Sequence, residues 1–190
     1  GSAVQWLRDG LGLIENASET EDLANSVPNS AGVVFVPALT GLGAPDWDPN
    51  ARGAIFGLTR GATRAHVVRA TLEAIAFEVR DVVDVMVNEA DVSLPRLTVD
   101  GGAAANNFLC QAQADQIKVP VVRSEILETT GLGAAFLAGL GTGFWSNKEE
   151  LAKTWRSDRT FEPQDRDEQS HRRWRVAVER TKGWATAVSK

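Results

Sequence analysis

The sequence predicts a layered α/β domain, in which a largely buried sheet is flanked by helices. Short apolar stretches alternate with longer segments whose apolar residues recur every three or four positions, which is the spacing of an amphipathic helix. The composition agrees, because 43% hydrophobic and 24% charged residues are ordinary for a globular chain of 190 residues. In sheets of this class, ligands bind beyond the carboxyl ends of the strands.

The charge and the cysteine content argue against several classes of partner. A formal net charge of −5 disfavours nucleic acid or a membrane surface as the main partner. The sequence contains no run of 18 apolar residues and no signal peptide. The single Cys110 is interpreted as a buried structural thiol, and the two histidines lie too far apart for zinc spacing. We therefore expect a cytoplasmic chain with no metal site of its own.

The first third of the chain is expected to alternate helix, strand and loop. Residues 2–15 have apolar positions at helical spacing, and the polar segment 15–30 is expected to hold a second, short helix. Residues 33–36 read as a buried strand, and 53–58 as a short extended segment. Between them, 38–53 form a loop of a length that is typically functional or mobile in a compact domain.

That long loop carries two aspartates, Asp46 and Asp48, on either side of a tryptophan. Such a pair is able to bind a divalent cation. Aspartates in loops more often cap turns and pair with a nearby cation, which here is Arg52. We favour turn capping and the pairing with Arg52.

A long core-facing helix is expected from about 64 to 88, with Thr63 as its cap. Its apolar stripe consists of Val68, Leu72, Ile75, Val79, Val82 and Met86. Glu73 lies beside that stripe, within helical reach of Arg69 and Arg80. A surface ion pair is favoured over a catalytic role for this glutamate.

The rest of the chain continues the alternation. The expected elements are a strand over 96–100, a helix over 106–118, a strand over 119–123, a helix of small residues over 129–143 that allows close packing, a short helix from Asn147 to Trp155 and a last helix over 165–187 with a solvated basic face.

The junction between residues 96–100 and 106–118 carries the strongest local signal for a ligand. It reads as a strand that breaks at a glycine pair and re-enters at once as a helix, whose first N–H groups favour negative charge. Gly101 and Gly102 have no Cβ atoms, so a ligand is able to approach the main chain closely. Asn106 adds a side chain that both donates and accepts hydrogen bonds. From the residues alone, an ordinary strand–turn–helix connection is an equal alternative to a nucleotide loop.

Several motifs resemble the glycerol kinases, which belong to a wider family of sugar kinases with an actin-like ATPase (ribonuclease H-like) fold. The motifs are TGLGAPDWDP at 40–49, ARGAIFGLTRG at 51–61, DGGAAANNFL at 100–109 and GLGAAFLAGL at 131–140 with GFW at 143–145. They occur in order with compatible spacing over nearly the whole chain, and the resemblance is weakest in the final helix.

The resemblance implies an ATP-dependent kinase that transfers the γ-phosphoryl group of ATP to a hydroxyl of glycerol with Mg²⁺. Residues 1–190 look like most of the C-terminal, ATP-side domain, with the N-terminal domain and the start of this domain missing. By matching positions, the DGG segment with Gly101, Gly102 and Asn106 would contact the adenosine part of ATP or ADP. Gly1 and Gln5 match two further nucleotide contacts.

The same resemblance assigns no catalytic residue to this chain. In the family, the catalytic base, the phosphate loops and most glycerol contacts belong to segments that would precede Gly1. Since phosphoryl transfer depends on positioning and charge stabilisation, we expect no kinase activity from the chain alone. The full-length enzyme is expected to be a homo-oligomer that binds neither nucleic acid nor membrane.

Two alternatives remain at this point. The first is another carbohydrate kinase of the same family, acting on a pentulose or a tetritol, although the loop at 41–49 favours glycerol. The second is a nucleotide-binding or interaction module without catalytic function.

Overall fold

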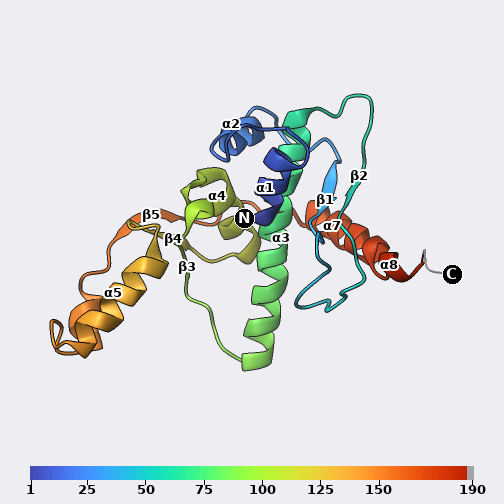
Figure 1. Ribbon diagram of the computed structural model, residues 1–190. Coiled ribbons are helices and arrows are strands. Elements are labelled where there is room, and N and C mark those ends of the chain that lie inside the picture. Colours follow the sequence, from blue (N-terminus) through green and yellow to red (C-terminus); the bar gives the residue numbers. More distant parts are fainter. Residues whose placement is uncertain (188–190) are drawn as a thin grey trace.

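A computed structural model describes residues 1–187 as an α/β arrangement built around one long helix (Figure 1). The helices are α1 (Ser2–Asp9), α2 (Glu19–Asn25), α3 (Arg64–Ala90), α4 (Asn107–Ile117), α5 (Thr129–Gly141), α6 (Lys148–Ala152), α7 (Glu168–Thr181) and α8 (Trp184–Ala187), with a 3₁₀ turn, η1 (Gly102–Ala105). The strands are β1 (Val34–Val36), β2 (Ala54–Phe56), β3 (Leu97–Val99), β4 (Val121–Ser124) and β5 (Ser157–Phe161).

The strands form two small sheets, where the sequence predicts one largely buried sheet. β1 and β2 pair antiparallel, whereas β3 and β4 pair parallel and β5 joins β4 antiparallel. Figure 1 shows α3 between the two sheets. Ala74 and Phe77 pack in the core of the first sheet, and Val79 and Val83 pack against that of the second. The predicted α/β class is confirmed, and α3 supplies the apolar surface that both sheets share.

The first predicted helix is shorter than expected. α1 ends at Asp9, and the chain then turns through Gly12, whose φ of +61° favours glycine. Leu7 and Ile14 nevertheless meet in one buried cluster. The helical spacing of these apolar residues thus correctly predicts that they are buried together. The helix itself ends earlier, because Gly10 and Gly12 follow Asp9.

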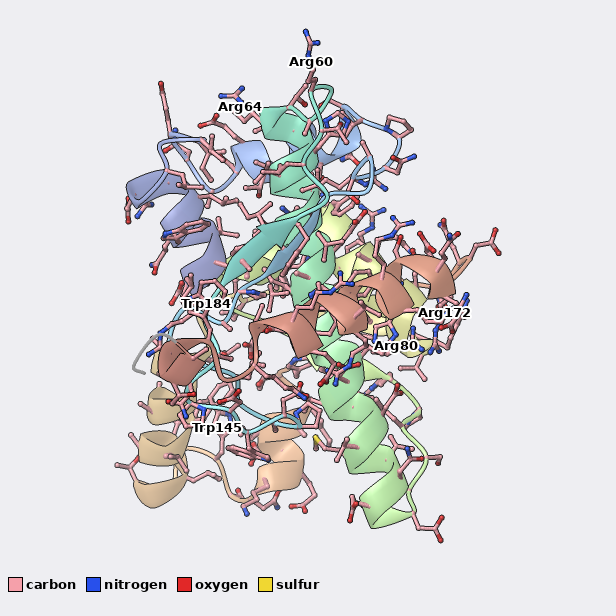
Figure 2. The ribbon with its side chains drawn as sticks, turned by 90° about the vertical axis from the view of Figure 1, so that its right-hand side faces the viewer. Arg60, Arg64, Arg80, Trp145, Arg172 and Trp184 are labelled. Carbon is pink, nitrogen blue, oxygen red and sulfur yellow. The ribbon has the colours of Figure 1, made fainter. Side chains whose placement is uncertain are left out.

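The long helix α3 confirms most of its prediction, except that Met86, the last residue of the predicted core-facing stripe, is 63% exposed. The backbone N–H of Thr63 donates to Nδ1 of His66 over 3.0 Å, which closes the first turn. Arg69 donates to Glu73 over 2.8 Å, so the expected pair forms, but it is half-buried rather than on the surface. Arg80 does not reach Glu73, because it donates instead to Glu168 of α7 over 3.0 Å, where the two helices approach (Figure 2).

The prediction for the long loop is half wrong. Asp48 caps a turn by accepting from the N–H of Asn50 over 2.8 Å, as expected. Asp46 does not pair with Arg52, since its carboxylate binds the guanidinium of Arg175 over 2.9 and 3.0 Å. Lys182 adds a second cation at 2.7 Å. The loop is therefore tied to the C-terminal helix, a partner 129 positions away that local spacing does not predict.

The C-terminal third departs from the prediction in two places. The single last helix is divided into α7 and α8 at Gly183, whose φ is +65°. β5 is absent from the predicted elements, because only Phe161 of its five residues is buried and the strand carries no apolar alternation. Trp174 of α7 is buried, and its Nε1 donates to the carbonyl of Phe35 in β1 over 3.0 Å.

Helix α5 has the predicted position but not the predicted close packing. None of its residues is buried, and Figure 1 shows it extending away from α3. The described helices include none that is long and apolar enough to cross a membrane.

Candidate functional site

A cavity of about 420 Å³ opens where α1, α2 and α3 meet the η1–α4 junction. Its lining is mostly apolar, with Val4, Leu72, Ile75 and Leu109 among the residues that form it. Such a cavity, with a few polar groups at defined places, is the usual form of a site for a small flat ligand.

Four of the five expected nucleotide contacts line this cavity. Gly1 and Gln5 come from the start of the chain, and Gly102 and Asn106 come from the junction before α4. The backbone explains the first pair, because Gln5 N–H donates to the carbonyl of Gly1 over 3.1 Å and the two residues share one helical turn. Gly101 does not line the cavity.

Gly101 and Gly102 have different roles at the junction before α4. Gly101 has φ +79° and ψ 169°, a backbone conformation that only glycine adopts readily, and its N–H donates to Leu127 over 2.9 Å. Gly102 faces open space, since a Cβ built there would meet no atom within 4 Å. Gly101 thus makes the turn, and Gly102 leaves the main chain accessible from the cavity.

The chain does not enter the helix directly after the glycines, as the sequence suggests. η1 intervenes, and α4 begins only at Asn107 because Asn106 has the extended φ and ψ of an N-cap (−79°, 111°). Its Oδ1 accepts from the N–H of Leu109 over 2.9 Å. The expected free N–H groups of this helix are therefore already capped in part by Asn106 itself.

Helix α2 holds this junction through two side chains that the sequence does not single out. Nδ2 of Asn106 donates to Oγ1 of Thr20 over 2.9 Å. The carboxylate of Glu21 accepts from the backbone and side-chain N–H groups of Asn107 over 2.7 and 2.8 Å. Both contacts join residues 86 positions apart, so no local pattern announces them.

The charged groups around the cavity are paired with protein atoms. Arg8 binds the neighbouring Asp9 over 2.7 Å, and Glu21 is held by Asn107. Behind the junction, Cys110 is buried as predicted, and burial raises the pKa of its thiol to about 11. Among the described residues, the one carboxylate of the lining, that of Glu21, is therefore engaged by the protein itself.

Asp100, which directly precedes the glycine pair, forms a hydrogen bond with another residue of the chain. Its Oδ2 accepts from Oγ1 of Thr129 at the start of α5 over 2.7 Å. Over residues 1–187, no three His, Cys, Asp or Glu side chains gather in a way that could hold a metal ion.

The family model for the C-terminal domain of the FGGY family of carbohydrate kinases matches residues 1–142. The glycerol kinase of Aromatoleum aromaticum is 60% identical over 190 residues, which cover 98% of this chain and 38% of that protein. Glycerol kinase 2 of Thermotoga maritima is 57% identical over 187 residues, which cover 97% of this chain and 38% of that protein. The chain thus spans about two-fifths of the length of these relatives.

Among solved structures, the glycerol kinase of Plasmodium falciparum with ADP is similar over 95% of this chain and 37% of its own. The TM-score is 0.82 at 37% sequence identity. This similarity confirms the actin-like ATPase fold that the sequence motifs imply. From its sequence and its fold alike, the chain belongs to the FGGY family of carbohydrate kinases.

Proposed function

We propose that this chain is the ATP-side domain of a glycerol kinase and that the cavity beside Asn106 holds the adenosine part of ATP or ADP. One observation carries the proposal. Gly1, Gln5, Gly102 and Asn106 were expected to bind nucleotide from motif positions alone, and these residues from two distant segments line one cavity.

The character of the cavity supports an adenosine rather than a phosphate subsite. Its walls are mostly apolar, which suits the flat base, and its polar groups include the amide side chains of Gln5 and Asn106 and the main chain at Gly102. A triphosphate needs cations or a series of free N–H groups, and the one arginine of the lining is paired with Asp9. The phosphates are therefore bound, in this proposal, by segments outside residues 1–190.

Two surfaces support the proposal that the domain is completed by the rest of a longer protein. α5 is apolar nearly all round its surface, and its Leu137 is 72% exposed. A helix that is apolar on all sides is normally buried in a complete protein. Among the described strands, β3 pairs only with β4, through contacts such as Leu97 N–H to Pro120 O over 2.9 Å. Along a strand, successive residues direct their backbone N–H and C=O groups to opposite edges. The N–H and C=O of Thr98 therefore point to the edge of β3 that does not face β4.

The proposed division of tasks rests on the resemblance to the family. This domain binds and orients the nucleoside, and the catalytic base, the glycerol pocket and the phosphate loops belong to the remaining part of the enzyme. Mg²⁺ is bound mainly by substrate phosphates in kinases of many folds, so it too would lie with those segments. We further propose a cytoplasmic homo-oligomer for the full-length enzyme.

The choice of glycerol rests on similarity in sequence. Curated glycerol kinases match at 52–60% identity, whereas a xylulose kinase of Lactobacillus acidophilus shares the fold at 24%. The alternative substrates are a pentulose or a tetritol.

Steady-state kinetics of the full-length protein with ATP and glycerol, xylulose or erythritol tests the assignment. We expect the highest kcat/KM with glycerol and no turnover by the purified 190-residue chain. A higher kcat/KM with xylulose or erythritol would replace glycerol by that substrate. Turnover by the chain alone would show that the division of tasks is wrong.

A further inference from the structure

Asn106 is the proposed adenosine contact, and its amide group has only one orientation that satisfies its neighbours. The N–H of Leu109 is a donor without acceptor capacity, so the atom that faces it must be the oxygen of the amide. The nitrogen is then directed to Thr20, where the distance from Nδ2 to Oγ1 is 2.9 Å.

Thr20 accepts that hydrogen bond because its own proton is used elsewhere. Its Oγ1 donates to the carbonyl of Ala17 over 2.6 Å, which leaves the hydroxyl lone pairs for Asn106. The threonine is 1% exposed, so water does not substitute for either partner. A directed chain of hydrogen bonds thus runs from Asn106 through Thr20 to the backbone of the turn before α2.

We propose that Thr20 is a positioning residue for nucleotide recognition, which fixes the amide of Asn106 so that the cavity selects adenine over guanine; this rests on the proposed function. After its two protein contacts, the amide retains one N–H and one lone pair of Oδ1. Adenine offers the matching acceptor and donor at N7 and N6, whereas guanine offers two acceptors at N7 and O6. Without the Thr20 hydroxyl, only the N–H of Leu109 holds the amide, and the nitrogen that would donate to adenine N7 is no longer held in direction.

Three variants of the full-length kinase test the inference. Thr20→Val keeps the shape of the side chain and removes the hydroxyl, and Thr20→Ser restores the hydroxyl. Thr71→Val is the matched control, because Thr71 is equally buried and its hydroxyl donates only to Val67 O over 2.9 Å in α3. Each is assayed for KM and kcat with ATP and with GTP, and for its melting temperature.

We expect Thr20→Val to raise the KM for ATP roughly three- to tenfold, the value of one hydrogen bond, with kcat and the KM for GTP little changed. Thr20→Ser should restore the KM for ATP. Thr71→Val should lower the melting temperature without changing the ratio of the two KM values. A Thr20→Val enzyme with the ATP-to-GTP preference of the parent would overturn the inference.

Asn106→Ala in the same assays separates this inference from the proposed function. If Asn106→Ala leaves the KM for ATP unchanged, the adenosine site itself is wrong. If Asn106→Ala raises that KM and Thr20→Val does not, the site stands and the positioning role of Thr20 is wrong.

Discussion

Asn106 has both a structural and a proposed binding task, and substitutions are able to separate them. Asn106→Ala removes the cap of α4, which costs about 1 kcal/mol of folding stability. Asn106→Asp keeps an oxygen that accepts from Leu109, but it removes the N–H that faces Thr20. We expect the Asp variant to be the more stable by about 1 kcal/mol. The KM for ATP should be raised in both variants, and more in Asn106→Ala, because alanine loses both proposed contacts to adenine and aspartate loses only the N–H.

Thermal unfolding and ATP kinetics of the two full-length variants check this expectation. A KM for ATP that is normal in Asn106→Asp and raised in Asn106→Ala would mean that the nucleotide needs only an acceptor from residue 106. The directed amide would then have no part in recognition.

Glu78 on α3 gives the stability a specific pH dependence. Burial, with a smaller effect of the Asp81 carboxylate, raises the pKa of Glu78 from 4.5 to about 7. The folded state therefore binds this proton more tightly than the unfolded chain, and stability falls as the pH rises from about 4.5 to 7. Glu78→Gln, which does not ionise, should be more stable than the parent at pH 8 by about 2 kcal/mol and similar to it at pH 5.

Urea unfolding of the unsubstituted protein and of Glu78→Gln at pH 5 and pH 8 measures that difference in the free energy of unfolding. Equal stability of the two proteins at both pH values would contradict the raised pKa.

The long loop and helix α7 are held together by an ion pair at Asp46, whose side chain is only 9% exposed. Arg175 and, to a smaller extent, Lys182 hold the pKa of Asp46 below its ordinary value of 3.8. The pair thus stabilises the fold above about pH 4, and its contribution is lost as the pH falls through the pKa of the folded state. Asp46→Asn should cost roughly 1–3 kcal/mol at pH 7, because it removes the buried carboxylate that both cations share and leaves them only Asp81 and Glu179.

Asp9→Asn is the control for that measurement, since Asp9 forms a solvent-exposed pair with Arg8. Its effect on the free energy of unfolding should be much smaller than that of Asp46→Asn, because solvent screens the pair. Equal effects of the two substitutions would show that Asp46 does not fasten the loop.

Local patterns predicted the elements whose signals lie within a few residues. The Thr63 cap, the Asn147 cap and the buried strand at Val34–Val36 are of this kind. Contacts between distant segments escaped prediction, as with Arg80 and Glu168 or Asp46 and Arg175. β5 escaped as well, because an edge strand with four exposed residues has the pattern of a loop.

In the candidate site too, residues within local motifs could be predicted from the sequence, whereas contacts between distant segments could not. Motif positions gave Gly102, Asn106, Gly1 and Gln5, which the fold brings to one cavity, while their nucleotide contacts stay a prediction. Thr20 and Glu21 were not found, since α2 has only a polar segment as its signal and its partners follow 86 positions later. Gly101 has a positive φ and does not line the cavity, so the structure gives it a turn, and its contact with a ligand stays a prediction.

A crystal structure of the full-length protein with ADP tests most directly where the nucleotide binds. A second cavity, of about 250 Å³ beside Arg69, Glu73 and Asp167, provides the comparison within this chain. We predict that the adenosine lies in the cavity lined by Gln5, Gly102 and Asn106. Adenosine bound in the second cavity, or away from both, would contradict the assignment.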